Sequence, residues 1–298
     1  MEMFQTILII LLILFIFILI ASVDLAFYVT KPKRFSLNKC MDIEKSKNFW
    51  GNYDQFPIEK WNVTCPDGYV LHGELSVNNP QKFVIITHGY TYTRYGSVKY
   101  ANIFYPLGYS VYLYDLRHHG ENQSCYCSMG QNEPNDVITI AKALRDRFGE
   151  DIEIGLHGES LGCATSLLAL GLSQNFKFLI ADCGFSSLKE LLIYQSHVRF
   201  HIPKFLVYTA NWANFLMHRY LFFSIKPIDA LSHNQVPICF MHGKADNFIP
   251  PSMSEDMYQA NSSYQELYLF DNANHAESYQ VNPERYTHIV EEFLKKMN

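Results

Sequence analysis

The chain has 298 residues, of which 48% are hydrophobic and 15% aromatic, and it carries a formal net charge of −5. This composition supplies ample material for a core, while the length fits either one large domain or two small ones. The mild acidic balance and the lack of a long basic block exclude a typical nucleic-acid-binding protein, and they do not indicate an acidic substrate.

The first feature along the chain is an apolar stretch, Met3–Val23, that contains no charged residue. As a helix it would span about 30 Å, which is the thickness of the hydrocarbon core of a bilayer. We therefore expect residues 1–34 to form a single-pass membrane anchor with a basic flank. A cleaved signal peptide is the main alternative, but only Glu2 and the α-amino group precede a rather long apolar run. A buried core helix is a weaker alternative because the run is apolar on all sides.

The basic residues and the cysteines bear on the orientation of this anchor. Four basic residues follow the stretch: Lys31, Lys33, Arg34 and Lys39. By the positive-inside rule they would keep the large C-terminal part on the cytoplasmic side. The seven cysteines are odd in number and scattered, which is typical of reduced thiols rather than of a disulfide framework. We expect the large C-terminal part to lie in the cytoplasm, with an extracytoplasmic location as the alternative.

Residues 35–298 have the pattern of one α/β domain. Residues 35–58 suggest a linker and a surface helix, and two strand-like runs flank Pro66-Asp67-Gly68, as in a hairpin. Apolar strand-like runs then alternate with stretches of helical periodicity. The runs predicted as strands are 83–87, 109–115, 178–182, 238–241 and 266–270, and the helical stripes lie within 137–148 and 286–294. This alternation predicts a mostly parallel, doubly wound sheet with helices on both faces.

The strongest local signal is the stretch Ile152–Gly162. An alternating strand-like run leads directly into Gly158-Glu-Ser160-Leu-Gly162, and a segment of small, helix-compatible residues follows. A strand that reverses into a helix within one or two residues requires a strained turning residue and flanking glycines. Such a turn would place the Ser160 hydroxyl at a helix N-terminus, where N–H groups favour negative charge. A glycine- and serine-rich loop without a chemical role is the alternative.

A serine nucleophile needs a base and a group that orients the base. In open α/β sheets such groups gather at the carboxyl ends of the strands. Asp246 follows the predicted strand 238–241, and His275 follows the strand 266–270. The chain order Ser, Asp, His is the order that this type of sheet imposes. We therefore predict that Ser160, Asp246 and His275 form a catalytic triad.

Two backbone N–H groups are predicted to stabilise an oxyanion near Ser160. One belongs to Leu161 at the start of the helix, and the other to Tyr90 in the loop after the strand 83–87, where Gly89 would permit close approach. His88 in that loop is an alternative base. Asp115-Leu-Arg-His-His-Gly120 has the residue types of a metal site but not the spacing, so we interpret it as a supporting loop.

The segment 188–226 interrupts the alternation of strands and helices. It is too long for a simple crossover and carries many aromatic residues. We interpret it as a cap or lid that lines an apolar pocket, with an enlarged helical layer of ordinary core as the alternative.

The motifs together resemble the α/β-hydrolase superfamily, and within it the lysophospholipase-like and serine-aminopeptidase-like group of membrane-anchored bacterial esterases. The matching pieces cover residues 60–298 in the right order: Thr87-His-Gly-Tyr90, Tyr114-Asp-Leu-Arg-His-His-Gly120, Gly158-Glu-Ser-Leu-Gly162, Gly243-Lys-Ala-Asp246 and Asn274-His275. The resemblance implies an α/β-hydrolase fold with a cap inserted at 188–226. It also implies Ser160 as nucleophile, Asp246 as acid, His275 as base, and Tyr90 and Leu161 as oxyanion donors. His118 departs from the small residue that related sequences often carry.

The resemblance and the residues together predict hydrolysis of carboxylic esters with apolar or amphiphilic acyl groups, through an acyl-enzyme and without a cofactor or metal. A peptidase or amidase with the same triad is the first alternative, in which Glu159 or Glu190 would recognise a free amino terminus. A catalytically silent, membrane-tethered binding protein is the second. The expected partners are a small-molecule acyl ester and, through the N-terminal helix, a membrane. No nucleic acid is expected, and nothing indicates an oligomeric state.

Overall fold

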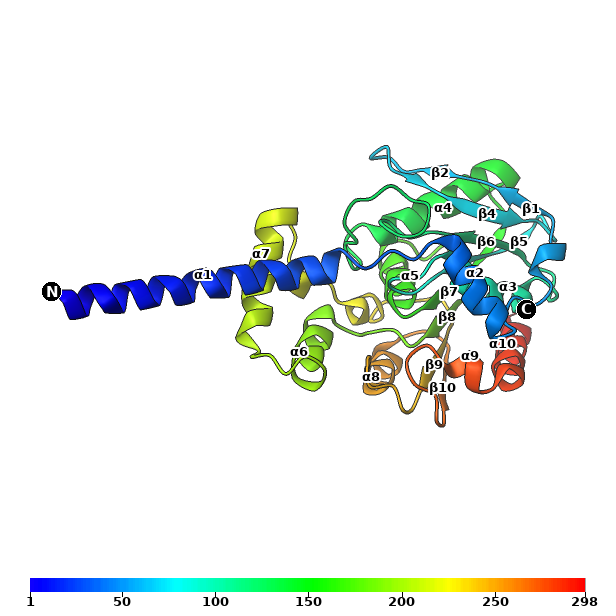
Figure 1. Cartoon of the computed structure of the whole chain (residues 1–298). Coiled ribbons are helices and arrows are strands. Elements are labelled where there is room, and N and C mark those ends of the chain that lie inside the picture. Colours follow the sequence, from blue (N-terminus) through cyan, green and yellow to red (C-terminus); the bar gives the residue numbers. More distant parts are fainter. Residues whose placement is uncertain (298) are drawn as a thin grey trace.

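A computed structural model describes residues 1–297, and within this range a mixed sheet of eight strands lies between two layers of helices (Figure 1). The strand order is β1-β4-β6-β5-β7-β8-β9-β10. These strands are β1 (Ile58–Lys60), β4 (Gly73–Ser76), β5 (Lys82–Thr87), β6 (Ser110–Tyr114), β7 (Glu153–Glu159), β8 (Leu179–Asp182), β9 (Ile238–Gly243) and β10 (Gln265–Phe270). Strands β5 to β10 pair in parallel, and β4 is antiparallel to both of its neighbours. The expected mostly parallel sheet is confirmed.

The predicted hairpin forms a separate two-stranded ribbon. Its strands are β2 (Val63–Thr64) and β3 (Val70–Leu71), which pair antiparallel on either side of the turn at Pro66–Gly68. The ribbon packs through β2 against the helix α4 (Glu133–Phe148).

Two apolar cores lie on opposite faces of the sheet, because alternate side chains of each strand point in opposite directions. In β5, Phe83 and Ile85 belong to one core, and Val84 and Ile86 belong to the other. This double burial explains why the strand is a continuous apolar run. Besides α4, the helices around the sheet are α2 (Leu37–Ser46), α3 (Val98–Phe104), α5 (Leu161–Leu172), α8 (Ser252–Ala260), α9 (Ser278–Val281) and α10 (Pro283–Met297), with short 3-10 turns at η1 (Tyr53–Gln55), η2 (Arg94–Ser97) and η4 (Pro227–Ala230).

The insertion 188–226 is helical and lies on the side of the molecule from which the N-terminus projects (Figure 1). It comprises α6 (Leu188–Val198), α7 (Phe205–His218) and the turn η3 (Phe222–Ser224). The Ser187 hydroxyl caps α6 by accepting a hydrogen bond from the Glu190 N–H, and α7 ends at Arg219 in a left-handed conformation with a φ of 65°. The inner side of these helices covers the edge of the sheet at which Ser160 lies.

The N-terminal helix α1 (Glu2–Thr30) projects far from the domain (Figure 1). Its most apolar window has a mean hydropathy of 3.4 and is only 6% buried, so by length and composition the helix is able to cross a membrane. It does not end with the apolar stretch at Val23. From Ser22 to its end the helix packs against the domain: the hydroxyls of Ser22 and Thr209 of α7 lie 2.6 Å apart, and Ala26 and Thr30 are fully buried.

The division at residue 34 stays a prediction, and the packing of α1 bears only on its C-terminal end. The end of α1 belongs to the folded domain. The helix α2, expected as a surface helix, also presents a buried side that includes Cys40 and Glu44.

Candidate active site

Ser160 lies on the turn between β7 and α5 and has the strained backbone that the sequence predicted, with a φ of 57° and a ψ of −114°. The two flanking glycines allow this turn. A Cβ atom at Gly158 would lie 2.4 Å from the Gly162 carbonyl oxygen, and one at Gly162 would lie 2.1 Å from the Thr87 carbonyl oxygen. Real Cβ atoms do not approach backbone so closely, so only glycine fits at either position.

Three side chains that are distant in the sequence meet at this turn. The Ser160 Oγ lies 2.8 Å from His275 Nε2, and His275 Nδ1 lies 2.7 Å from Asp246 Oδ2. Asp246 stands just after β9 and His275 just after β10, at the carboxyl ends of adjacent parallel strands. The residue types and the order of the hydrogen bonds are those of a nucleophile, a base and an orienting carboxylate.

The Asp246 carboxylate is held by more than His275. Its Oδ1 accepts hydrogen bonds from the N–H groups of Phe248 and Ile249, and its Oδ2 is 3.1 Å from Nε2 of the buried His242. Burial alone would raise the pKa of Asp246, but the hydrogen bonds from His242 and His275 outweigh it and hold the pKa below its ordinary value. The carboxylate therefore stays ionised and fixed in orientation.

The two residues predicted to supply oxyanion donors, Tyr90 and Leu161, line the apolar cavity together with Ser160. Within residues 1–297 neither the N–H of Tyr90 nor that of Leu161 donates an intramolecular hydrogen bond. A Cβ at Gly89 would lie 3.5 Å from the Cβ of Ser160, so the loop of Tyr90 approaches the serine closely, although this position is not sterically restricted to glycine. Unsatisfied N–H groups beside a nucleophile are the geometry that stabilises a developing oxyanion.

The loop that carries Tyr90 is fixed from two directions. The Tyr90 hydroxyl donates to the carbonyls of Tyr28 and Val29 at the end of α1, at 2.8 and 3.0 Å. On the other side, the Thr91 N–H donates to Nε2 of His119 at 3.1 Å. The position of Tyr90 thus depends on the N-terminal helix.

The ring nitrogens of His88, the alternative base, bond backbone groups rather than Ser160. Its Nδ1 donates to the Gly89 carbonyl and its Nε2 accepts from the Leu116 N–H, so both ring nitrogens are occupied. Burial lowers the pKa of His88 to about 4 and that of His119 to about 3, which keeps both rings neutral.

The loop Asp115–Gly120 supports the site through a buried ion-pair cluster. Arg94 pairs with Asp115 at 2.5 Å and with Glu74 at 3.1 Å, and all three side chains are almost completely buried. Among residues 1–297 no group of three or more His, Cys, Asp or Glu side chains is arranged to hold a metal ion. His118, the departure noted in the sequence, adopts a φ of 67°, and its Nδ1 accepts from the Cys125 N–H.

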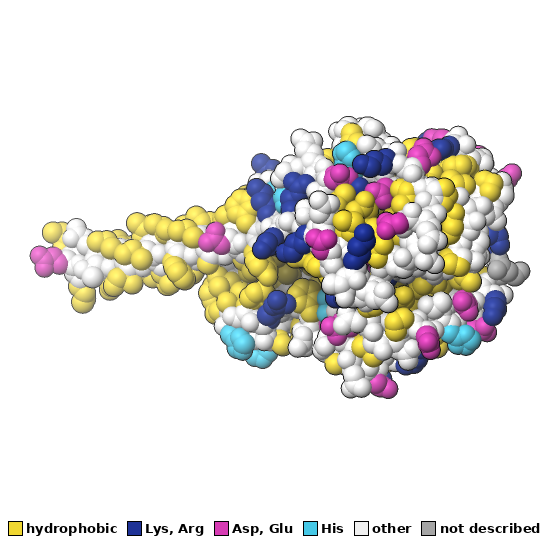
Figure 2. Space-filling view, turned by 45° about the vertical axis from the view of Figure 1, so that its right-hand side comes forward, with side chains coloured by type: hydrophobic (Ala, Val, Ile, Leu, Met, Phe, Trp, Pro, Cys, Tyr) yellow, Lys and Arg dark blue, Asp and Glu magenta, His cyan; other side chains and the backbone are white. Residues whose placement is uncertain are grey.

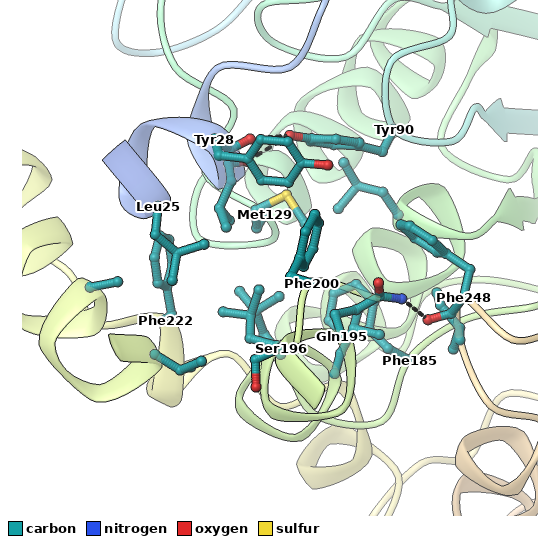
Figure 3. A pocket seen from close by; sticks show the side chains of 18 of the residues that line it. Leu25, Tyr28, Tyr90, Met129, Phe185, Gln195, Ser196, Phe200, Phe222 and Phe248 are labelled. Atoms are coloured by element: carbon teal, nitrogen blue, oxygen red, sulfur yellow. Dashed lines mark hydrogen bonds between the residues drawn. The ribbon is translucent and has the colours of Figure 1, made fainter. Parts of the chain in front are cut away.

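An apolar cavity of about 830 Å³, including open space at its mouth, is lined by Ser160 and by residues of the cap. Figure 3 shows side chains that line it, among them Leu25, Phe200 and Phe222. Its walls come from α6, α7, η3 and the loops around them, and also from the end of α1. The α1 residues in the wall are Leu25, Tyr28 and Val29. The Phe248 ring packs on the His275 ring at 4.8 Å, and its carbonyl accepts a hydrogen bond from Gln195 of α6. The segment 188–226 therefore lines the cavity at Ser160, as expected of a cap, rather than forming only a helical layer of ordinary core.

A second cavity, of about 1050 Å³ including open space at its mouth, meets the first one at Ser160. This polar cavity has a mixed lining, with more polar surface than the first cavity. Its lining includes Glu44, Lys99 and Glu159, as well as His275. Lys99 pairs with Glu159 at 2.8 Å, and both are largely buried.

Glu44 is the unusual residue of this polar cavity. It is 1% exposed, and within the described part of the chain its Oε2 has no hydrogen-bond partner. Burial raises the pKa of Glu44 to about 7, because the effect of Lys99 only partly offsets the cost of burying the charge.

The fold and this constellation define the class of protein, and the comparisons agree. The chain resembles solved α/β-hydrolase esterases. The esterase Pf2001 of Pyrococcus furiosus has a TM-score of 0.72 and 24% identity, with 90% of this chain and 98% of that chain covered. The ferulic acid-bound Est1E of Butyrivibrio proteoclasticus has a TM-score of 0.63 and 17% identity, with 80% and 98% covered. The chain has the α/β-hydrolase fold and is a serine hydrolase of that type.

The family follows from the sequence matches. Residues 103–298 match the prolyl oligopeptidase family, Peptidase_S9. The chain is also 30% identical over 261 residues to the Bacillus subtilis (strain 168) protein described as "Uncharacterized protein YqkD", with 86% of each chain covered. The protein belongs to the prolyl oligopeptidase family of α/β hydrolases.

Several residues of the site were missed in the sequence. The α1 residues that line the cavity were missed because the sequence analysis interpreted that stretch only as a membrane anchor. Glu44 was missed because its helix was interpreted as a surface helix. Of the two acidic residues proposed to recognise an amino terminus, Glu159 is paired with Lys99, and Glu190 lines a different cavity that Ser160 does not line.

Proposed function

We propose that the protein is a membrane-anchored serine esterase that hydrolyses esters of an apolar acyl chain with a polar alcohol. The observation that carries this proposal is the position of Ser160 where an apolar and a polar cavity meet. The apolar cavity suits an acyl chain, because aliphatic and aromatic side chains dominate its walls. The polar cavity, with its buried carboxylates and Lys99, suits a hydrogen-bonding alcohol.

The proposed mechanism is acyl transfer in two steps. His275 takes the proton of the Ser160 hydroxyl as its oxygen attacks the ester carbonyl, and Asp246 stabilises the imidazolium that results. The N–H groups of Tyr90 and Leu161 stabilise the tetrahedral oxyanion. His275 then gives the proton to the departing alcohol, which leaves an acyl group on Ser160. Water releases the acid by the same route, with His275 again as the base.

The test is a series of 4-nitrophenyl esters of increasing acyl length, measured with the full-length protein in detergent. We expect kcat/KM to rise from acetyl to medium chains and to vanish in Ser160→Ala. Val207, on the inner face of α7, lines the apolar cavity. Val207→Trp would fill that cavity and shift the preference to shorter chains. A wild-type protein that turns over none of these esters would contradict the proposal.

A peptidase or amidase is the second candidate, and two observations favour it. The family match is to prolyl oligopeptidases, and Glu44 presents an unpartnered carboxylate to the polar cavity, where an ammonium group would be stabilised. Turnover of aminoacyl 4-nitroanilides relative to the matching 4-nitrophenyl esters separates the two functions. Faster anilide turnover that falls selectively in Glu44→Gln would favour the peptidase.

We also propose that α1 is a retained membrane anchor with the catalytic domain on the cytoplasmic side. The support for retention is that Val29 and Thr30 are buried in the domain and that Tyr90 binds carbonyls at the end of α1. The support for the orientation is the basic segment directly after the helix. The intact mass of the purified protein tests retention. Protease treatment of right-side-out and inverted vesicles tests the orientation, and digestion of the domain in right-side-out vesicles would contradict it.

A further inference from the structure

The outer face of α7, next to the side that packs against α1, is an apolar surface that stays exposed among residues 1–297. Four of its side chains lie at helical spacing and remain exposed: Phe205 by 50%, Tyr208 by 46%, Trp212 by 61% and Leu216 by 65%. The opposite face of the same helix is buried, and it includes Val207 and Ala210, which line the apolar cavity. An amphipathic helix with its apolar face turned outward marks a contact with another apolar phase.

The position of α7 relative to α1 identifies that phase. The helix α7 runs across α1 at the point where α1 leaves the domain (Figure 1), and Ser22 of α1 contacts Thr209 of α7. If α1 spans a bilayer, the point where α1 leaves the domain is at the membrane surface. A helix that runs across α1 at that point therefore lies along the surface. The exposed face of α7 is thus continuous with the exposed apolar surface of α1. Tyrosine and tryptophan on this face are typical of the boundary between lipid and water.

The charge of this part of the chain also fits a membrane surface. Between Glu190 and Asp229 the sequence contains four Lys or Arg residues, three His residues and no acidic residue. Lys31, Lys33 and Arg34 are exposed directly after α1. Figure 2 shows Lys and Arg side chains gathered where the projecting helix meets the domain. Basic residues around an apolar face strengthen attachment to bilayers that contain anionic lipids.

We propose that the outer face of α7 lies in the interfacial layer of the bilayer that α1 crosses, so that the apolar cavity opens onto lipid. Tyr28 and Phe200 line the cavity, contact each other with ring centroids 5.3 Å apart, and are 55% and 38% exposed. Tyr28 belongs to α1, and Phe200 lies in the loop between α6 and α7, so the two exposed rings join the membrane helix to the cap at this cavity. This inference rests on the proposed function in one respect, because it adds that the acyl ester reaches Ser160 from the membrane rather than from water.

The depth of Trp212 tests the proposal directly. The full-length protein is reconstituted in vesicles of phosphatidylcholine and phosphatidylglycerol whose acyl chains are brominated near the headgroup or near the chain end. We expect strong quenching of Trp212 fluorescence by the shallow bromines, and loss of this quenching in Trp212→Phe. Trp50 is 7% exposed and Trp61 is also within the domain, so they give a constant background.

Two outcomes would overturn the proposal. Trp212 that is not quenched in vesicles holding the inserted protein would mean that the face is not in lipid. If Trp212 is shielded from water only at high protein density and the bromines do not quench it, then a second copy of the chain covers this face. Neither result depends on catalysis, and flotation of the protein with the vesicles checks α1 separately, so failure here is distinguishable from failure of the esterase proposal.

A pair of variants tests the consequence for substrate entry. Phe205→Gln combined with Leu216→Gln should lower activity toward an ester embedded in vesicles by roughly tenfold relative to activity toward a water-soluble short ester. The matched control combines Leu172→Gln and Tyr264→Gln, which are similarly exposed, at 56% and 47%, but lie toward the amino ends of the strands, away from the cap. This control should leave the ratio unchanged. A ratio that falls equally in both variants, or in neither, would contradict entry from the membrane.

Discussion

The N-terminal helix is expected to be part of the active site, and two truncations test this. Removing residues 2–19 deletes only the projecting part of α1, whereas removing residues 2–30 also deletes the turns that pack against α7 and line the apolar cavity. The carbonyls at the end of α1 accept hydrogen bonds from the Tyr90 hydroxyl and, at Thr30, from the Cys127 N–H. The domain thus satisfies helix-end groups that would otherwise face water.

The loss of stability expected from the longer truncation follows from these contacts. Val29 is 5% exposed, and burying such a side chain contributes about 1.5–3 kcal/mol. Each of the hydrogen bonds adds about 1 kcal/mol. The longer truncation therefore removes roughly 4–6 kcal/mol from a total stability on the order of 5–15 kcal/mol. It should lower Tm by roughly 10 °C or more.

The assay compares Tm and the kinetics of a water-soluble short ester for both truncations. We expect the shorter truncation to behave like the full-length protein and the longer one to lose stability and activity together. Tyr90→Phe separates the two effects, because it removes only the bonds to Tyr28 and Val29. It should lower kcat by roughly tenfold, within the limit of about 10²–10³ for complete loss of an oxyanion donor, with a small change in Tm. A protein without residues 2–30 that keeps both Tm and kcat would refute this reasoning.

Three further predictions concern single side chains. Asp246→Asn should lower kcat by roughly 10³–10⁴, because His275 loses its orienting charge. A circular dichroism spectrum should show the fold intact, and a near-normal kcat would contradict the proposed role. Gly162→Ala should yield little folded protein or an inactive site, since its Cβ would meet the Thr87 carbonyl at 2.1 Å, and soluble yield with turnover measures this. Burial raises the pKa of Glu44 from 4.5 to about 7, so ionisation of this carboxyl destabilises the fold progressively as the pH rises through that window. Glu44→Gln should therefore raise Tm near pH 8, by the equivalent of roughly 3 kcal/mol, and change it little near pH 5; equal Tm values near pH 8 would count against the prediction.

The sequence was most informative where local geometry allows few alternatives. The turn around Ser160 requires glycine at two fixed positions, and this requirement is visible as a motif next to a strand. Asp246 and His275 were found because parallel strands end at the same edge of a sheet, so that residues after separate strands meet in space. The strands themselves were visible because burial on both faces makes them continuously apolar.

What the sequence did not reveal depends on packing between distant segments. The apolarity of Met3–Val23 predicts a membrane helix, but it contains no signal that the following turns pack against α7. The buried position of Glu44 was also hidden, because a short polar helix with one glutamate on its inner side has the composition of a surface helix. The hydrogen bond from the Tyr90 hydroxyl to α1 joins residues about 60 apart, and no local pattern encodes it.

The central claim is that His275 activates Ser160 for attack on an acyl carbonyl, and covalent labelling measures this most directly. The full-length protein is treated with a fluorophosphonate probe, and the modified peptide is identified by mass spectrometry. We predict a single label on Ser160 in the wild type, no label in Ser160→Ala and greatly slowed labelling in His275→Ala. A wild-type protein that does not react, or one that reacts equally fast without His275, would contradict the account.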